Sequence, residues 1–454
     1  MMFILKSIFL LFSVFISNLT NAELVNSNII RDINLKKTFP TDTTRIVLFY
    51  NSGEQTAPIT EYIFSINSTA HKNLMDISAS EIKTGNELLI RKLETQSSIS
   101  DVDYSVHLNS PLRPENKLSI KIIATFLRHF EPQPKSIKIN EDAFYRCLPS
   151  SRILSYSKSP SPVSADDNTL TFGPYSRIDQ LDTAPISVHF FMEETPSIIT
   201  DFARSISISH FSGSISLDDY TELLNDGPKL IDYNRVDYYK ATIQRSLKNT
   251  MNGFNVHVPL DARNIYYTDI IGNVSTSHVS RSEVSDSLLL QLKPRFPVMS
   301  GWKFSFNVGY TSSLSNYLKY NPSTKKYSFK AYPYSDPIEM GIKNYKLQIT
   351  LPEGAYDIEY NPSFGADSVE ITTEKGYLGF FGSKKIVFSK KNTSPSEIGP
   401  VYVMYKYSNL QLLLKPIIVS MFLFGIYLAF SMLGSYIALV DSVKTTKDVS
   451  KSKK

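Results

Sequence analysis

The sequence predicts a mainly β protein, with two tandem antiparallel β-sandwich-like domains followed by one C-terminal transmembrane helix. Apolar and polar residues alternate along many short segments, which is typical of half-buried strands. Tyr and Phe, which favour strands, each occur 27 times, whereas Gly occurs only 18 times in 454 residues. A long uncharged apolar run lies near the C-terminus and predicts the membrane helix.

The N-terminal end is expected to be a cleaved signal peptide over residues 1–22. Lys6 provides a positive charge, and an apolar run follows from Ile8 to Ile16. Thr20 and Ala22 occupy the −3 and −1 positions of the expected cleavage site. The alternative is an N-terminal membrane anchor, but the apolar run is too short to cross about 30 Å of hydrocarbon.

The body of the chain is expected to form two β-rich domains, 23–240 and 241–408, since its length suits two domains of about 100–200 residues each. Ile206 and Ile208 alternate with serines in the first part. In the second part, the segment Trp302–Tyr310 alternates aromatic or apolar residues with polar ones. This period of two places one face of each strand on a core and the other in water.

Three further segments have specific local predictions. Pro352-Glu353-Gly354 predicts a turn, with a return strand from Tyr356 to Tyr360. The segment Ser150–Asn168 is rich in Ser, Pro and Asp, and is expected to be a long loop. The short acidic segment Leu217–Asn225 is expected to be helical, with the domain junction following it at about 227–248.

The C-terminal apolar run predicts a transmembrane helix over residues 416–440. The run Ile417–Val440 carries no charge and spans about 36 Å at about 1.5 Å per residue. The tail 441–454 is rich in Lys, and positive residues stay in the cytosol, so the body is expected to be lumenal or extracellular. A lipid-anchor signal is not expected, because it would end on its hydrophobic segment.

Small residues gather on one side of this expected helix, within about a third of its circumference at about 100° per residue. They let helices approach closely, so this face is expected to pack on a partner helix, with chance enrichment as the alternative. The residues of this packing face are Ser420, Ser431, Gly434, Ser435 and Ala438.

Two kinds of modification are suggested by the lumenal or extracellular position of the body. Asn67, Asn273 and Asn392 each begin an Asn-x-Ser/Thr sequon and are expected glycosylation acceptors, with Pro395 counting against Asn392. The one cysteine, Cys147, cannot form a disulfide within the chain. It is expected to be a buried small hydrophobe, with pairing to a partner chain as the alternative.

Motifs for catalysis are not found in the sequence. The seven histidines form no zinc-binding spacing, and neither a nucleophile elbow nor a phosphate-binding loop occurs. His210 is expected to be a hydrogen-bonded core histidine, and the carboxylate pairs, such as Asp218-Asp219, are expected to be solvated. We therefore expect no catalytic, cofactor-binding or metal-binding residues and no cofactor. Positive charge is not clustered with aromatic residues, so nucleic acid is not an expected partner.

Several segments of this sequence resemble the ribophorin I family. The resemblance is strongest in the second half of the body and matches the family in order and spacing. One extra residue, Ser212, interrupts the Ser-His-x-Gly pattern of the family, and the tail is short. The matching segments are Tyr266–His278, Pro294–Pro297, Gly301–Lys303, Val308–Tyr310 and Leu351–Ala355, with looser matches at Gly173–Tyr175 and Ser209–Gly213.

This resemblance implies an accessory subunit of the oligosaccharyltransferase, the endoplasmic reticulum complex that transfers a preassembled oligosaccharide from dolichol pyrophosphate to Asn of nascent proteins. The catalytic subunit is polytopic and carries a Trp-Trp-Asp-Tyr-Gly motif, whereas this chain has one tryptophan and one expected anchor. The resemblance thus implies a non-enzymatic, single-pass type I membrane protein with its body in the lumen. Implied partners are the other subunits, including the catalytic one, membrane lipid, and also nascent polypeptide and the translocon.

Two other classes of protein remain open on sequence grounds. A single-pass cell-surface receptor or adhesion protein would share the topology and the β-sandwich body, but disulfides would be expected in it. A lumenal hydrolase on a β scaffold would need a nucleophile or a metal site. Neither alternative explains the segments that resemble the ribophorin I family.

Overall fold

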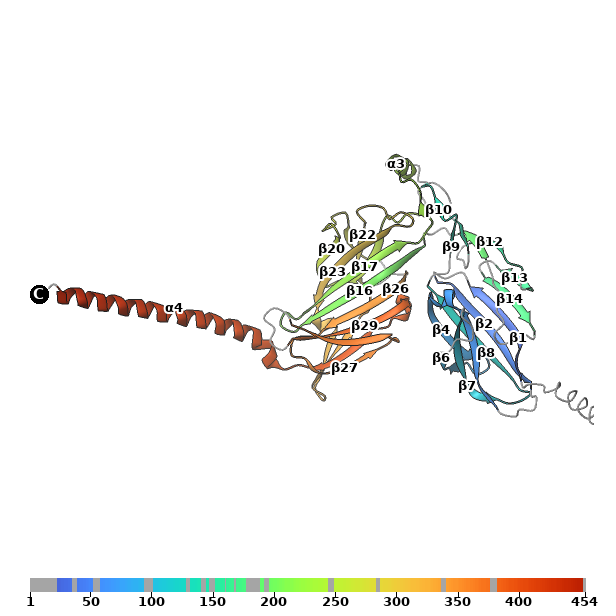
Figure 1. Cartoon of the computed structure of the whole chain (residues 1–454), viewed down its shortest axis with the longest axis horizontal. Helices are drawn as coiled ribbons and strands as arrows, with labels where there is room; N and C mark the ends of the chain where they lie inside the picture. The colour runs from blue at the N-terminus through green and yellow to red at the C-terminus, as the bar shows by residue number, and fades with distance from the viewer. Residues whose placement is uncertain are drawn as a thin grey trace, which may run out of the picture.

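The computed structural model describes residues 23–451 apart from 35–38, 52–57, 94–100, 128–130, 140–143, 147–151, 160, 167–168, 177–187, 192–195, 244–248, 283–285, 336–339 and 376–381. The described chain is mainly β and ends in one long helix (Figure 1). The expected signal peptide and Cys147 lie outside the described residues. We call residues 23–191 the first region and residues 197–406 the second region.

The first region is built on a seven-stranded sheet, the first large sheet, with the strand order β13-β14-β1-β2-β8-β4-β5. Its neighbouring strands pair antiparallel. In β8, every second residue is buried, as the alternation of its sequence requires. The strands are β1 (Glu23–Asn34), β2 (Thr41–Asn51), β4 (Leu74–Glu81), β5 (Glu87–Leu88), β8 (Lys117–Phe126), β13 (Val163–Asp166) and β14 (Thr169–Tyr175).

Smaller sheets complete the first region. A three-stranded sheet shares a core with the first large sheet, in which Leu48 and Ile120 meet Val106. It consists of β3 (Ile59–Asn67), β7 (Asp101–Leu112) and β6 (Ile90–Lys92), and the short helix α2 (Ser68–His71) follows β3. A four-stranded sheet consists of β12 (Arg152–Tyr156), β15 (Val188–Phe191), β11 (Phe144–Arg146) and β9 (Glu131–Gln133).

The second region is built on another seven-stranded sheet, the second large sheet, with the order β20-β23-β17-β16-β26-β29-β28. The central pair β16 and β26 is parallel, and the other pairs are antiparallel. The strands are β16 (Ser197–Ser209), β17 (Ser214–Asn225), β20 (Arg263–Asp269), β23 (Lys303–Ser313), β26 (Gly341–Thr350), β28 (Ser368–Glu374) and β29 (Ser383–Thr393).

Two smaller sheets share one continuous core with the second large sheet; Leu290, Phe329 and Val403 all lie in it. One sheet consists of β19 (Phe254–Pro259), β22 (Ser287–Leu292) and β21 (His278–Arg281). The other consists of β24 (Leu318–Asn321), β25 (Lys326–Ala331), β30 (Val401–Lys406) and β27 (Tyr356–Pro362). The helices of this region are α3 (Arg235–Ile243), η1 (Leu314–Asn316) and η2 (Pro395–Glu397).

The two regions touch at several points. The short strands β10 (Ser136–Ile137) and β18 (Lys229–Leu230) pair in parallel. Met75 and Leu127 form a small buried cluster with Ile198 of the second large sheet. The Asn392 amide donates a hydrogen bond to the Lys72 carbonyl oxygen at 2.9 Å. The contacts of Met75, Leu127 and Lys72 join the β4 side of the first large sheet to the second region.

The structure differs from three of the local predictions. The segment 217–225 is not helical but lies in β17, where it pairs with both β16 and β23. Residues 150–168 are not one loop, because they contain β12 and β13. The turn at 353–354 is present, but β27 does not return along β26; it pairs with β30 in a different sheet.

The division between the large sheets also differs from the expected boundary at residue 240. β16 and β17 precede that boundary, yet they form the centre of the second large sheet. The sheets therefore divide between Phe191 and Ser197. The physical reason is that an alternating pattern identifies a strand but not the sheet in which it finds a partner.

The C-terminal helix α4 (Asn409–Lys451) projects away from the second region (Figure 1). Its segment Leu410–Val440 is long and apolar enough to cross a membrane, and its most apolar stretch is not buried against the described chain. Pro416 lies inside the helix. The prediction of one apolar C-terminal helix is confirmed, and the helix extends beyond residue 440 into the lysine-rich tail.

Candidate functional site

Arg204 and Asp219 form a buried ion pair in the second large sheet. They are register partners on β16 and β17. The exposed fractions of their side chains are 1% and 8%. Arg204 Nε donates to Asp219 Oδ1 at 2.6 Å, and Arg204 Nη1 donates to the Tyr332 carbonyl oxygen at 2.9 Å. Arg204 Nη2 also donates to Ser335 Oγ at 2.5 Å, so the guanidinium is held from several sides.

The charge on Arg204 is stabilised by its partner. Burial alone would lower the pKa of Arg204, because it disfavours the charged form. The charge and the hydrogen bonds of Asp219 outweigh burial and hold the pKa of Arg204 above its ordinary value. Arg204 therefore stays charged, and with Asp219 it gives the sheet a fixed polar point inside an apolar core.

The adjacent carboxylates Asp218 and Asp219 point to opposite faces of β17, as expected for neighbours on a strand. Asp218 Oδ1 accepts a hydrogen bond from the Tyr266 hydroxyl at 2.7 Å, and its Oδ2 accepts one from Asn307 Nδ2 at 3.1 Å. The prediction that the pair is solvated is wrong for Asp219, which is 6% exposed. Arg204 explains this burial.

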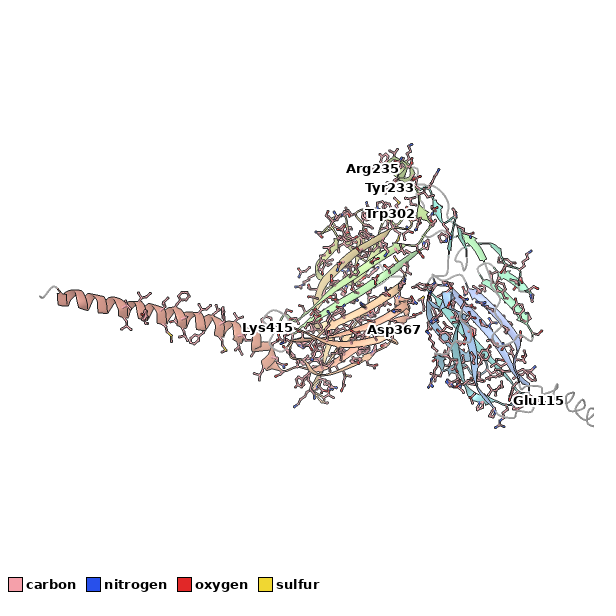
Figure 2. All side chains as sticks on the ribbon, in the orientation of Figure 1. Glu115, Tyr233, Arg235, Trp302, Asp367 and Lys415 are labelled. Carbon is pink, nitrogen blue, oxygen red and sulfur yellow. The ribbon has the colours of Figure 1, made fainter. Side chains whose placement is uncertain are left out.

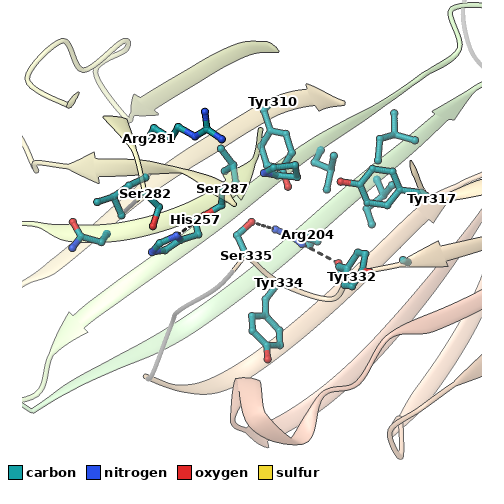
Figure 3. Close-up of a pocket in the computed structure, with 18 of the residues that line it drawn as sticks. Arg204, His257, Arg281, Ser282, Ser287, Tyr310, Tyr317, Tyr332, Tyr334 and Ser335 are labelled. Atoms are coloured by element: carbon teal, nitrogen blue, oxygen red, sulfur yellow. Dashed lines mark hydrogen bonds between the residues drawn. The ribbon is translucent and has the colours of Figure 1, made fainter. Parts of the chain in front are cut away.

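A cavity of about 960 Å³ opens beside Arg204. Its floor comes from the second large sheet, one wall from the sheet of β19, β21 and β22, and the other from β25 and the segment after it (Figure 3). The floor is apolar, with Ile206, Ile215 and Leu217. Four tyrosines line it as well: Tyr310, Tyr317, Tyr332 and Tyr334.

The polar wall of the cavity carries several hydrogen-bonding groups. His257 Nδ1 lies 2.8 Å from Ser287 Oγ, and Arg281 pairs with Asp286 on the exposed rim. Burial raises the pKa of Tyr310 to about 12, so this phenol stays neutral. Among the described residues, no group of three His, Cys, Asp or Glu is placed to hold a metal ion. Such a lining is typical of a binding cleft, with aromatic faces and a few hydrogen-bonding groups.

His210 lies at the other end of β16. Its Nε2 is 2.8 Å from the Tyr405 hydroxyl, and its ring stacks on that of Tyr407 with centroids 4.6 Å apart. Burial lowers its pKa. The prediction of a hydrogen-bonded histidine is confirmed, although its side chain is only half-buried.

The three sequon asparagines have different surroundings. Asn67 is exposed and caps α2, where its Oδ1 accepts a hydrogen bond from the Thr69 N–H at 2.9 Å. Asn273 is exposed and follows the turn after β20. Asn392 has a φ of 47° and gives its amide to Lys72, and the next two residues, Thr393 and Ser394, are buried. Asn273 is thus the most open of the three.

The turn before Asn273 is fixed by an ion pair within the segments that resemble the ribophorin I family. Arg295 Nε donates to Asp269 Oδ2 at 2.7 Å, and this hydrogen bond lowers the pKa of Asp269 to about 2. Asp269 Oδ1 also accepts hydrogen bonds from the N–H groups of Ile271 and Gly272. Ile270 and Ile271 are 90% and 75% exposed at the tip.

The packing of Tyr266, in one of these segments, explains why residue 309 is a glycine. A Cβ at Gly309 would lie 2.2 Å from the ring of Tyr266, which crosses β23 at this point. Only Gly leaves room for that ring, so Gly309 and Tyr266 depend on each other. The segments Tyr266–His278 and Val308–Tyr310 thus meet where β20 pairs with β23.

The small-residue face of α4 is exposed along its length. Ser420, Ser431, Gly434, Ser435 and Ala438 are all exposed, and a Cβ at Gly434 would contact nothing within 4 Å. The Ser435 hydroxyl donates to the Ser431 carbonyl oxygen at 2.9 Å, which satisfies it inside the helix. The face is therefore available to a neighbouring helix.

Sequence reasoning missed Arg204 and the cavity. Arg204 shares its strand face with Phe202 and Ile206, and Asp219 shares its face with Leu217 and Leu223. A hairpin closed at the turn 210–213 places 204 opposite 219. An opposite-charge pair on the apolar phase of both strands could have been found in this way.

These features define a class of protein: a β-rich chain with two large sheets, a cleft lined by aromatic and hydrogen-bonding side chains, and a C-terminal helix able to span a membrane. A family model described as Ribophorin I matches residues 24–147 and 143–434. The chain therefore belongs to the ribophorin I family.

Three similar proteins are named as subunits of a glycosyltransferase. The chain is 26% identical over 442 residues to dolichyl-diphosphooligosaccharide–protein glycosyltransferase subunit 1A of Arabidopsis thaliana, covering 90% of this chain and 69% of that one. It is 25% identical over 403 residues to subunit 1 of Caenorhabditis elegans, covering 84% and 67%. Subunit 1B of Arabidopsis thaliana is 25% identical over 402 residues, covering 82% and 85%.

A solved structure, native yeast LTA4 hydrolase, matches 47% of this chain and 29% of that chain with a TM-score of 0.27 and 10% identity. Nothing about fold or function follows from so low a score.

Proposed function

We propose that this chain is a non-catalytic, accessory subunit of the oligosaccharyltransferase of the endoplasmic reticulum, supporting transfer of a preassembled oligosaccharide to Asn of nascent chains. The observation that carries this proposal is the ribophorin I match, which covers most of both regions and reaches into α4. Relatives that are 26% and 25% identical over 90% and 84% of this chain are named dolichyl-diphosphooligosaccharide–protein glycosyltransferase subunit 1A and subunit 1.

The proposed role is structural rather than chemical. Transfer to an amide needs a group that stabilises the departing pyrophosphate, usually a metal or a cationic clamp. The two arginines that line the cavity, Arg204 and Arg281, are each already paired with an aspartate. Reaction chemistry is therefore assigned to a polytopic partner subunit, with the two regions of this chain as tandem β-sandwich-like domains that support it.

The proposed topology places both regions in the lumen and the lysine-rich end of α4 in the cytosol. The lysines after Asp441 support this orientation, because positive residues are retained on the cytosolic side. The same orientation exposes the sequons to the glycosylation machinery. Asn273 is the favoured acceptor, Asn67 the second, and Asn392 the least favoured, since its amide already joins the two regions.

The small-residue face of α4 is proposed to pack on a helix of a partner subunit. Gly434→Leu with Ser435→Leu should weaken retention of the chain in the complex, because Leu side chains would separate the helices. Ala429→Leu is the matched control, since it also introduces Leu but on the opposite side of the helix from the small-residue face. Equal retention of both variants after mild detergent extraction would contradict a packed face.

Co-purification and depletion together test the proposed function. After mild detergent extraction, the full chain should co-purify with a polytopic transferase. Cells depleted of the chain should make glycoproteins of lower mass through under-occupied sequons, whereas the purified chain alone should transfer no oligosaccharide. Normal occupancy without a co-purifying transferase would favour a cell-surface receptor instead, and surface labelling would then detect the chain.

A further inference from the structure

The end of the second region from which α4 emerges is fastened to the first turns of that helix. β30 ends at Lys406 and α4 begins at Asn409. Glu353, in the turn after β26, forms an ion pair with Lys415 at 3.4 Å. A Cβ at Gly354 would lie 2.5 Å from the Gln411 side chain, so this turn packs directly on the helix. Figure 2 shows Lys415 at this junction.

In the proposed topology, Lys415 lies at the level of the bilayer surface. The uncharged run of α4 starts just after it at Ile417, and at about 1.5 Å per residue that run alone covers about 36 Å, enough for a hydrocarbon core of about 30 Å. Lysines at the ends of membrane helices hold their charge at the interface. Since Glu353 contacts Lys415, the turn that carries Glu353 lies at the interface too.

The same end of the second region presents exposed aromatic and apolar side chains. β16 and β26 run parallel with Ser207 opposite Thr350, so the turn 210–213 lies beside the turn that holds Glu353. Phe211, at the tip of that turn, is 73% exposed. Tyr356, which pairs in register with Lys406, is 53% exposed, and Leu410 in the first turn of α4 is 75% exposed.

Phe211 is held in this position by rigid neighbours. His210 stacks on Tyr407, which lies two residues before α4, and bonds to the Tyr405 hydroxyl. Tyr327 completes the cluster, with its ring centroid 4.9 Å from that of His210. Gly213 adopts a φ of 61°, which closes the tight turn. The turn that carries Phe211 is thus braced against the segment that leads into the membrane helix.

We propose that this end of the second region docks on the lipid surface, with Phe211 inserted at the boundary between headgroups and acyl chains. The proposal rests on the membrane-spanning role of α4 in the proposed function. Continuity with that helix identifies the occupant as lipid, because any bilayer that holds Ile417–Val440 also reaches the level of Glu353 and Lys415. Aromatic side chains are favoured at this depth, and insertion of about 5–10 Å is typical of interfacial segments.

The charges around Phe211 are compatible with a headgroup layer. The carboxylate of Asp357 is neutralised by Lys326 and Lys406, at 3.2 and 2.9 Å. Lys319 and Lys325, on β24 and its turn, are exposed. The face therefore offers cations to lipid phosphates, and its nearest acidic groups are paired.

A matched aromatic lies away from this face. Tyr239 on α3 is 66% exposed, and α3 lies at the opposite end of the second region from the start of α4 (Figure 1). A reporter placed at Tyr239 or at Phe211 therefore compares lipid contact at two aromatic positions of similar exposure. The one tryptophan, Trp302, lies beside Tyr233 near α3 and can be replaced by Phe to leave a single reporter.

Fluorescence quenching in vesicles tests the proposal. The full chain carrying Phe211→Trp and Trp302→Phe is reconstituted into phosphatidylcholine vesicles whose acyl chains are brominated near the headgroup. Its emission should shift to the blue and lose intensity relative to unbrominated vesicles. The chain carrying Tyr239→Trp and Trp302→Phe should show neither change. Circular dichroism equal to that of the wild type verifies that both variants are folded.

Several outcomes would overturn the proposal. Emission from Phe211→Trp that is as unquenched as that from Tyr239→Trp would show that the turn stays in water. Quenching of both variants would show that lipid contact is not confined to this face. Tyr356→Trp, on the same face, gives an independent second reporter and should be quenched as well.

This experiment separates failure of the proposal from failure of the proposed function. Flotation with the vesicles reports the span of α4 alone, and loss of flotation would contradict the membrane topology and the proposal together. A chain that floats with an unquenched reporter contradicts only the docking. Membership of the transferase complex is tested by co-purification and does not enter this measurement.

Discussion

The two regions organise their cores differently. In the first region, the fully buried residues form a cluster around Leu48 and Val106, another around Leu170 and Phe172, and a third around Val102 and Phe126. The first and third are linked only by half-buried side chains among the described residues, those of Phe64, Ile77 and Ile90. In the second region, most of the described core belongs to one cluster that joins three sheets. A continuous core couples its parts, so the second region is expected to open as one unit and the first region in smaller steps.

The regions also differ in how they place an arginine–aspartate pair. Arg204 and Asp219 pair inside the second region, where the Arg204 side chain is 1% exposed. Arg45 and Asp32 pair on the first region, where the Arg45 side chain is 50% exposed. Removal of the arginine should therefore lower the unfolding free energy strongly in the second region and weakly in the first. Water can take the place of the lost partner only at the surface.

The largest expected effect comes from breaking the buried pair. Arg204→Met leaves the Asp219 carboxylate buried without its partner, which should cost about 3–5 kcal/mol of unfolding free energy. Native-state hydrogen exchange of the full chain in detergent measures this cost separately for each region. Protection should fall across the whole second region, since its core is continuous.

The matched control is Arg45→Met in the first region. Loss of an exposed pair should cost no more than about 1 kcal/mol. Equal losses from Arg204→Met and Arg45→Met would contradict the contrast between the regions. Loss of protection confined to β16 and β17 would contradict a single cooperative unit.

A smaller effect is expected from acid, and it acts on both regions. His71 in the first region lies 2.9 Å from the Tyr104 hydroxyl, and His210 in the second lies 2.8 Å from that of Tyr405. Burial lowers the pKa of both histidines below 6.5, with Lys92 adding to the effect at His71. The folded chain therefore binds fewer protons than the unfolded chain, and stability falls as pH drops below about 6.5.

Two substitutions assign this acid sensitivity to its source. His71→Gln should remove part of the pH dependence of hydrogen exchange in the first region only, and His210→Gln should do so in the second only. Hydrogen exchange of both variants and of the wild type, measured from pH 7.5 to pH 5, tests this assignment. An unchanged pH slope in both variants would mean that other groups are responsible.

The smallest effect concerns the contact between the regions. Asn392→Ala removes the hydrogen bond to the Lys72 carbonyl oxygen, which should cost about 0.5–1 kcal/mol. Because the bond joins the regions, protection should fall near Lys72 as well as near Asn392. Asn67→Ala, which removes a cap within the first region, is the control and should leave residues around 392 unchanged.

Strand-by-strand prediction succeeded where the pattern is local. The alternation from Trp302 to Tyr310 corresponds to β23, and the turn at 353–354 is present. The segment 217–225 failed because its acidic residues conceal a period of two, with Leu217, Asp219 and Leu223 all facing the core. Pairing failed for β27, since a turn fixes where a strand begins but not which neighbour it joins.

The site was less predictable than the fold for a related reason. The cavity is formed by residues from three sheets, and its walls at His257 and Tyr332 are distant in sequence from its floor at Ile206. The local periodicity of a sequence does not indicate which distant strands come together to form a cavity. The ion pair of Arg204 with Asp219 was within reach, because a hairpin fixes its register.

The parallel pairing of β16 with β26 has a consequence for how the chain is made. Ser205 and Gln348, which meet across these strands, are 143 positions apart. During synthesis, the hairpin of β16 and β17 emerges early with both edges open, and its β16 edge waits longest, because β26 follows β23 in the chain. An open edge is a template for wrong pairing, so this edge of β16 can mispair until β26 has been made.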